Sequence, residues 1–193
     1  MIKTQRFALA LLFLGCVSCG KDPVPKPRGL LRLDYPKAVY KETDADLPFS
    51  FEKNDLAQPL KKVKVDEKNG SFGVNIDYPT LKATIYLTYI KVTPDNLIQL
   101  IKESQNLTQE HTQKADNIES NLYENDAHHV YGMFYEVGGN AASQSQFYVT
   151  DSIHHFLNGS LYFYAKPNYD SILPAANYLK KDIRHIMESL KWK

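Results

Sequence analysis

Both cysteines of the chain, Cys16 and Cys19, lie at the end of an apolar N-terminal segment. Lys3 and Arg6 precede this segment and no acidic residue accompanies them, an order typical of a secretory signal. The apolar run is shorter than the roughly 20 residues that span a bilayer, so it predicts a leader that is removed. Residues 20–193 contain no cysteine. The exported domain therefore cannot rely on disulfides and must fold around an apolar core of its own.

The residues around the cysteines predict a bacterial lipobox, in which a cysteine follows small and apolar residues and takes a diacylglycerol. Cys19 has Val17 and Ser18 before it, which makes it the favoured lipidation site. Cys16 is the alternative, although bulky Leu14 stands close before it. A redox or zinc role for the two cysteines is less favoured, because they lie in a leader without partner ligands. Beyond this covalent lipid at the mature N-terminal cysteine, we expect no cofactor.

The composition divides the chain into three parts. We expect a lipoprotein signal peptide over residues 1–18, a lipidated proline-rich tether over 19–29 and a single globular domain over 30–193. Three prolines within residues 20–29 favour an extended polyproline II tether. The formal net charge is +1 and no block of like charge occurs. Nucleic acid is therefore not an expected partner, and the lipid is the expected link to the membrane.

Alternating apolar residues predict a series of short strands. The segment Ala83–Val92 has apolar or aromatic side chains on both faces, which is typical of an interior strand of a covered sheet. Gly138 and Gly139 predict a hairpin turn after one of the later strands. The predicted strands are Leu30–Tyr35, Phe49–Phe51, Val63–Val65, Gly73–Tyr78, Ala83–Val92, His129–Val137, Gln144–Thr150 and Gly159–Ala165.

Two segments have helical periodicity. A helix is expected to start at Thr93 and Pro94, and a second to run from a cap at Asp170 or Ser171 to about Leu190. The polar segment between residues 105 and 125 predicts a partly helical, solvated excursion. Together these elements predict an α+β domain with a mainly antiparallel sheet and packed helices. The order of elements is similar to the Mog1/PsbP-type sandwich.

Two adjacent histidine pairs are the candidates for a metal site. The predicted strand begins at His129, and on a strand the neighbouring side chains of His128 and His129 point to opposite faces and cannot share an ion. His154 and His155 lie in a connection with freer geometry, where polar surface histidines are the more common explanation. We therefore expect no metal site.

Signatures of catalysis are missing from the sequence. It contains no Gly-x-Ser-x-Gly elbow, no phosphate-binding glycine loop and no His-Glu-x-x-His motif. We therefore expect neither an enzyme nor a small-molecule substrate. The 13 tyrosines and nine phenylalanines could line a glycan groove, but such residues more often fill a two-faced sheet.

Two Asp-Ser-Ile triplets, at 151–153 and 170–172, are candidate modification sites. They resemble the O-glycosylation signal of exported Bacteroidetes proteins, which makes Ser152 and Ser171 candidate glycan acceptors. The alternative is chance combined with helix capping, which Asp and Ser also supply.

Three stretches of the chain, Pro25–Pro36, Phe147–Phe163 and Lys166–Trp192, resemble the GldD gliding-motility lipoproteins of Bacteroidetes. The resemblance implies membership of the gliding machinery, whose lipoproteins are tied to type IX protein secretion. It supplies no catalytic residue.

These observations lead to one functional hypothesis and one alternative. The leading hypothesis is a lipid-anchored, periplasm-facing accessory that binds membrane proteins and lipoproteins of the gliding and type IX secretion machinery. Whether it sits at the inner or the outer membrane is left open. The alternative is a module that binds peptidoglycan or another glycan. The candidate contact residues for a protein partner are Lys26, Pro27, Arg28, His154 and His155.

Overall fold

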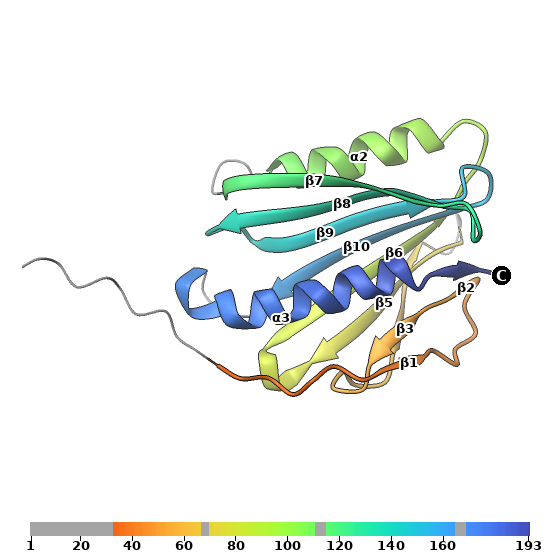
Figure 1. The fold of residues 1–193 in the computed structure, drawn as a ribbon. Helices are drawn as coiled ribbons and strands as arrows, with labels where there is room; N and C mark the ends of the chain where they lie inside the picture. The colour runs from red at the N-terminus through yellow and green to blue at the C-terminus, as the bar shows by residue number, and fades with distance from the viewer. Residues whose placement is uncertain (1–32, 67–69, 111–114, 165–168) are drawn as a thin grey trace, which may run out of the picture. The chain divides into compact units, whose positions relative to one another are not determined.

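A seven-stranded antiparallel sheet forms the centre of the domain (Figure 1). The computed structural model describes residues 33–66, 70–110, 115–164 and 169–193. The strand order is β4-β5-β6-β10-β9-β8-β7, and each neighbouring pair is antiparallel. The strands are β4 (Lys61–Asp66), β5 (Ser71–Tyr78), β6 (Ala83–Lys91), β7 (Ala115–Asn125), β8 (Val130–Gly139), β9 (Ser143–Thr150) and β10 (His155–Phe163).

Four short strands form two small ladders outside this sheet. β1 (Tyr40–Glu42) pairs with β3 (Glu52–Asn54), and β2 (Phe49–Ser50) pairs with the last strand, β11 (Lys191–Trp192). A 3-10 turn over Pro79–Leu81 joins β5 to β6. The second ladder brings the C-terminal segment beside a strand from the beginning of the domain.

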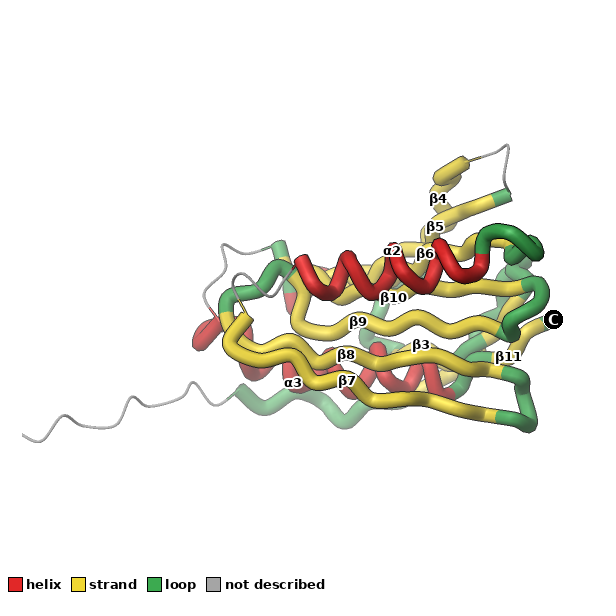
Figure 2. Tube along the Cα trace, turned by 90° about the horizontal axis from the view of Figure 1, so that it is seen from above, coloured by secondary structure: helices red, strands yellow, loops and turns green. Residues whose placement is uncertain are grey.

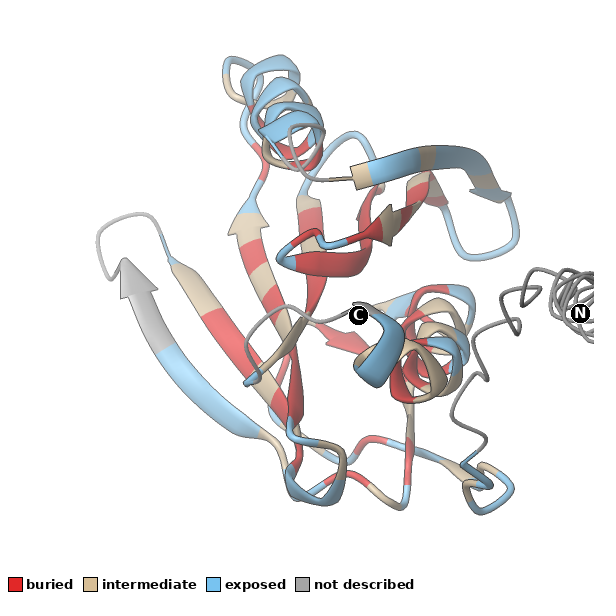
Figure 3. Ribbon diagram, turned by 90° about the vertical axis from the view of Figure 1, so that its left-hand side faces the viewer, coloured by how far each residue is buried: buried red, intermediate tan, exposed pale blue. Residues whose placement is uncertain are grey.

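The two helices cover opposite faces of the sheet (Figures 2 and 3). α3 (Tyr169–Glu188) contacts β9, β10 and β3, whereas α2 (Leu97–Gln109) contacts β9 and β10 from the other side. The larger core lies on the α3 face, where leucine, isoleucine and phenylalanine side chains of the sheet meet the apolar stripe of the helix. A smaller cluster around Leu100, Tyr148 and Phe156 lies under α2.

Successive side chains of β6 point alternately to these two faces of the sheet. Ile85, Leu87 and Tyr89 are buried in the larger core, as expected for alternating residues of an interior strand. Tyr86 and Ile90 point to the α2 face and are half-buried. The second face of β6 is therefore only partly covered by the helix.

A buried carboxylate ties the first strands to α3. Asp182 accepts hydrogen bonds from the Tyr40 hydroxyl of β1 at 2.7 Å and from the Asn54 amide of β3 at 2.9 Å. Asp182 is only 1 % exposed. On the outer side of the same helix, Lys180 and Arg184 each contact Glu136 of β8 at 2.7 Å. Polar bonds thus fix α3 to two separate parts of the sheet assembly.

The expected α+β class, the antiparallel sheet and both helices are confirmed, and the Mog1/PsbP likeness stays a prediction. The first helix was expected to start at Thr93 and Pro94, but α2 begins at Leu97 with Asn96 as its N-cap. Ala83–Val92 does lie in the sheet interior, as β6. The expected hairpin joins β8 to β9: Gly138 and Gly139 are the last residues of β8, Gly139 has a φ of 89°, and residues 140–142 make the connection. α3 begins at Tyr169, so Asp170 and Ser171 lie inside its first turn and are not its cap.

Two expected segments have a different structure. Residues 33–35 form no strand, because this stretch has no sheet neighbour, while residues 30–32 lie outside the described part. The segment 115–125, expected as a solvated excursion, forms the edge strand β7. Its pairing with β8 supplies backbone hydrogen bonds on one side, while most of its side chains stay exposed on both faces. An exposed edge strand needs no apolar alternation, so its sequence carries no strand signal.

Candidate functional site

The predicted site residues fall into three regions of the chain. Cys16 and Cys19, together with Lys26, Pro27 and Arg28, lie outside the described residues. The lipidation site and the tether contacts therefore stay predictions. The remaining candidates are Ser152, His154 and His155 in and beside the β9–β10 turn, and Ser171 on α3.

The turn between β9 and β10 is organised by the Asp151 carboxylate. Its Oδ1 atom accepts the backbone N–H groups of Ile153 at 2.9 Å, His154 at 2.8 Å and His155 at 2.8 Å. Ser152 has a φ of 67°, a left-handed conformation that the tight turn imposes. The turn therefore presents His154 and Ile153 to solvent from a rigid frame, and Ile153 is 65 % exposed.

His155 was expected in a connection, but it is the first residue of β10, where two aromatic neighbours hold it. Its Nδ1 atom lies 2.8 Å from the Tyr89 hydroxyl of β6. On the other side, its ring stacks on Trp192 of β11, with centroids 5.0 Å apart and an interplanar angle of 9°. The Trp192 indole N–H donates to the backbone carbonyl of His129 at 3.0 Å. Residues from three distant segments thus meet around one imidazole ring.

His155, Trp192 and His129 line a surface cavity of about 390 Å³, which we call the His155–Trp192 pocket. His128 and His129 form its second wall, in the turn between β7 and β8. The strand was expected to begin at His129, but β8 starts at Val130, and His129 has a φ of 52° because the chain reverses direction there. The lining residues are Ala127, His128, His129, Asp151, Ile153, His155, Lys191, Trp192 and Lys193.

Burial and hydrogen bonds shift the pKa values of two pocket groups. Partial burial by itself raises the pKa of Asp151, but the N–H groups of His155, Ile153 and His154 outweigh it and lower that pKa. Burial lowers the pKa of His155, and the nearby His154 and Lys91 add to this effect against the attraction of Asp151. At neutral pH the pocket therefore holds an ionised Asp151 and a neutral His155 imidazole beside Lys191 and Lys193.

The structure brings Ser152, His154 and His155 together but leaves Ser171 apart. Ser171 lies in the first turn of α3, whereas Trp192 follows the end of that helix. Twenty helical residues correspond to roughly 30 Å, so the two Asp-Ser-Ile triplets lie far from each other. Both serines are exposed. Their glycosylation stays a prediction that an intact-mass measurement tests.

The C-terminal residues of the pocket, Lys191, Trp192 and Lys193, were not predicted from the sequence. A signal existed for Trp192, since it is the single tryptophan of the chain and follows the strongest helical stripe. Its role depends on the pairing of β11 with β2, which places Trp192 opposite Phe49. No local sequence pattern predicts such a long-range strand pairing.

The pocket lining combines fixed aromatic rings with exposed aliphatic and cationic side chains. Within the described ranges, no group of three or more His, Cys, Asp or Glu side chains is placed to hold a metal ion. The Nδ1 atom of His155 is already engaged by Tyr89, and its ring is fixed against Trp192. What the pocket presents is an aromatic surface, an exposed aliphatic side chain at Ile153 and the cationic Lys191.

Comparison with known families adds a decisive observation: the sequence model of the gliding motility lipoprotein GldD matches residues 20–192. The chain belongs to the GldD family. This confirms the resemblance drawn from the three stretches, and it makes the chain a gliding motility lipoprotein by family. No curated protein and no solved structure matches the chain.

In this GldD protein, described residues of the three resembling stretches contact one another through two aromatic pairs. Tyr35, at the end of the first stretch, packs on Tyr178 of α3 with ring centroids 5.0 Å apart. His155 of the second stretch stacks on Trp192 at the end of the third. No helix in the described part of the protein is both long and apolar enough to cross a bilayer.

Proposed function

We propose that this GldD protein is a non-enzymatic, lipid-anchored accessory that faces the periplasm and binds components of the gliding and type IX secretion machinery. Cys19 carries the lipid in this proposal, and residues 19–29 form the tether. The His155–Trp192 pocket and the exposed turn beside it are the contact surface. Family membership supports the link to gliding, and the geometry of the pocket supports a protein partner.

The observation that carries the proposal is the convergence of two family-resembling stretches at an exposed, pre-organised surface. Asp151 fixes the turn through three backbone hydrogen bonds, and Trp192 is fixed by His155 and the His129 carbonyl. A rigid surface loses little conformational entropy when a partner binds. Tryptophan is also enriched among the residues that dominate binding energy at protein interfaces.

The chemistry of the pocket indicates the kind of segment it would take. Ile153 and the Trp192 ring suit an apolar side chain of the partner, whereas Lys191 and Lys193 suit acidic groups at the rim. We therefore propose a partner segment in which an apolar anchor is flanked by carboxylates.

The test uses the full chain with a purification tag in a gliding bacterium. Ile153→Asp places a charge on the exposed contact surface, and Trp192→Ala removes the ring. We expect both variants to lose the co-purifying machinery components and to reduce colony spreading and secretion. Cys19→Ala should lose the same components through failure of membrane attachment.

Ile98→Asp is the matched control, because Ile98 is 70 % exposed on α2, on the opposite face of the sheet. This control should co-purify the same components as the unmodified protein. The proposed contact surface would be wrong if Ile153→Asp and Trp192→Ala recovered the machinery components as well as Ile98→Asp does.

A further inference from the structure

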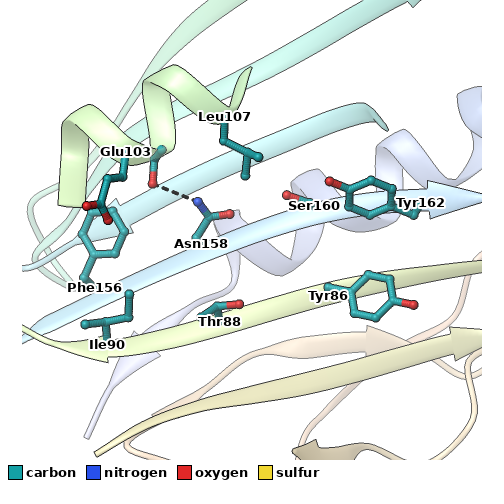
Figure 4. Close-up of a pocket in the computed structure, with 10 residues that line it drawn as sticks. Tyr86, Thr88, Ile90, Glu103, Leu107, Phe156, Asn158, Ser160 and Tyr162 are labelled. Carbon is teal, nitrogen blue, oxygen red and sulfur yellow. Dashed lines mark hydrogen bonds between the residues drawn. The ribbon is translucent and has the colours of Figure 1, made fainter. Parts of the chain in front are cut away.

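A second cavity lies on the opposite face of the sheet, between α2 and strands β6 and β10 (Figure 4). Its volume is about 400 Å³, within the roughly 300–1,000 Å³ range of small-molecule sites. Glu103 and Leu107 of α2 form one wall, and the two strands form the floor. We call it the α2 groove.

The floor of the α2 groove is a ladder of paired side chains from two interior strands. Phe156 lies opposite Ile90 at one end of the groove. The next pairs along the strands are Asn158 with Thr88 and Ser160 with Tyr86. The floor therefore changes from apolar, through amide and hydroxyl groups, to tyrosine rings.

Hydrogen bonds hold the polar centre of this floor in place. The Asn158 amide nitrogen donates to Ser104 of α2 at 2.8 Å, so its amide oxygen points along the groove (Figure 4). The hydroxyls of Thr88 and Ser160 have no hydrogen-bond partner among the described residues. Ser160 is only 6 % exposed, so a hydroxyl of limited water access faces the groove.

Tyrosines form the far end. Tyr86 and Tyr162 meet edge to face with centroids 5.8 Å apart. The hydroxyl of Tyr164, which is 65 % exposed, lies 3.0 Å from that of Tyr86 and 2.5 Å from Thr84 Oγ1. The rings are thus fixed relative to one another while their surfaces remain open to a ligand.

Three ligand classes fit this lining poorly. An extended peptide binds a sheet through a free strand edge, but β6 and β10 are hydrogen-bonded on both sides. An anionic ligand such as a nucleic acid needs cations, whereas no lysine or arginine lines the groove and Glu103 adds a carboxylate. A lipid chain would bury the Asn158 amide oxygen and the Thr88 and Ser160 hydroxyls without hydrogen bonds, which is costly.

We propose that the α2 groove binds a neutral saccharide whose chain lies parallel to β6 and β10. Sugar rings present both C–H faces, which pack on tyrosine rings, and hydroxyl edges, which hydrogen-bond to Asn158, Thr88 and Ser160. The groove lies on the other face of the sheet from the His155–Trp192 pocket, so this site is independent of the proposed protein contact.

The test is calorimetric titration of the detergent-solubilised full chain with chitotetraose, cellotetraose and a tetrapeptide. We expect saturable binding of at least one tetrasaccharide and none of the peptide. Tyr162→Ala should weaken saccharide binding about tenfold, as loss of an aromatic contact predicts. Thr88→Arg, which fills the centre of the groove without removing a core residue, should abolish it.

Tyr131→Ala is the matched control, because Tyr131 is a half-buried tyrosine of β8 outside the groove. It should bind the saccharide with unchanged affinity, as should Ile153→Asp. The proposal is overturned if neither saccharide binds, if only the peptide binds, or if Thr88→Arg binds as tightly as Tyr131→Ala. Circular dichroism of each variant distinguishes a blocked groove from an unfolded domain.

Discussion

Replacing Asp182 of α3 with alanine should lower the free energy of unfolding by about 3–5 kcal/mol. The carboxylate is almost fully buried and accepts hydrogen bonds from Tyr40 and Asn54, which are both far away in the chain. A hydrogen bond to a charged group contributes roughly 1.5–3 kcal/mol. Asn54 keeps its bond to the Tyr178 hydroxyl, and removing a buried charge offsets part of the loss. The expected loss of stability is therefore smaller than the sum of two such hydrogen bonds at their upper value.

Asp182→Asn is the informative comparison, with an expected loss of about 1–2 kcal/mol near pH 4. Its amide oxygen can still accept from Asn54, while its NH₂ group can donate to the Tyr40 hydroxyl. Tyr40 must then direct its own proton elsewhere, which accounts for the remaining cost. The two variants together separate the loss of hydrogen bonds from the loss of charge.

The pH dependence of this pair follows from the pKa of Asp182. Burial raises that pKa, and the hydrogen bonds from Tyr40 and Asn54 reverse the effect only in part. The folded state therefore binds the proton more tightly than the unfolded state. Protonation of Asp182 therefore stabilises the folded state. This stabilisation is fully present below the pKa of Asp182 in the unfolded chain, near 3.9, and it is lost as the pH rises through the pKa in the folded protein. The advantage of the wild type over Asp182→Asn should shrink as the pH rises.

The assay is urea unfolding of the full chain at a series of pH values from 4 to 7, followed by far-ultraviolet circular dichroism. A loss below about 1 kcal/mol for Asp182→Ala would refute the hydrogen-bond argument. An advantage over Asp182→Asn that grows with pH would show that the folded protein favours the charged form, contrary to the reasoning from burial.

Three further predictions concern other parts of the chain. Gly159→Ala should destabilise the fold by about 1–3 kcal/mol in thermal unfolding, because its Cβ would meet the buried Phe147 ring, and Phe147→Leu should recover part of the loss. Partial burial raises the pKa of Glu136, but its two cationic partners on α3 outweigh this and lower it. Its stabilisation is therefore present above the ordinary value of 4.5 and is lost on acidification, so Glu136→Gln should flatten the acid limb of a stability profile. Cys19→Ala should abolish incorporation of labelled fatty acid, whereas Cys16→Ala should leave it intact.

The parts of the fold that were predictable from sequence are those that bury one face. α3 and β6 show clear periods because Leu179 and Ile183, or Ile85 and Leu87, must reach the larger core. β7 was not predicted because a mostly exposed edge strand is held by backbone hydrogen bonds. Such bonds require no alternation of apolar and polar residues in the sequence. The first strand was missed because β1 has only three residues and is fixed largely by the distant Asp182.

Sites assembled from distant segments were the least predictable. His154 and His155 were predicted from the sequence. The Trp192 ring, which completes the pocket, is placed there by the two-residue pairing of β11 with β2. The tyrosines divide in a way that composition alone could not show. Tyr78 and Tyr89 fill the core as expected, while Tyr86 and Tyr162 line the α2 groove, because neighbours on a strand alternate between faces.

The strand order has a consequence for how the chain acquires its fold. β4 to β6 and β7 to β10 are two meanders whose internal pairs are close in sequence, and the β6–β10 ladder is the sole junction between them in the described sheet. Pairing of β6 with β10 closes a long loop. The entropy of loop closure is lost before the contacts between the two strands form, which slows folding. Until β10 arrives, β6 presents an open edge rich in isoleucine, leucine and tyrosine. A chain interrupted before β10 should therefore aggregate through this edge rather than persist as a soluble half-domain.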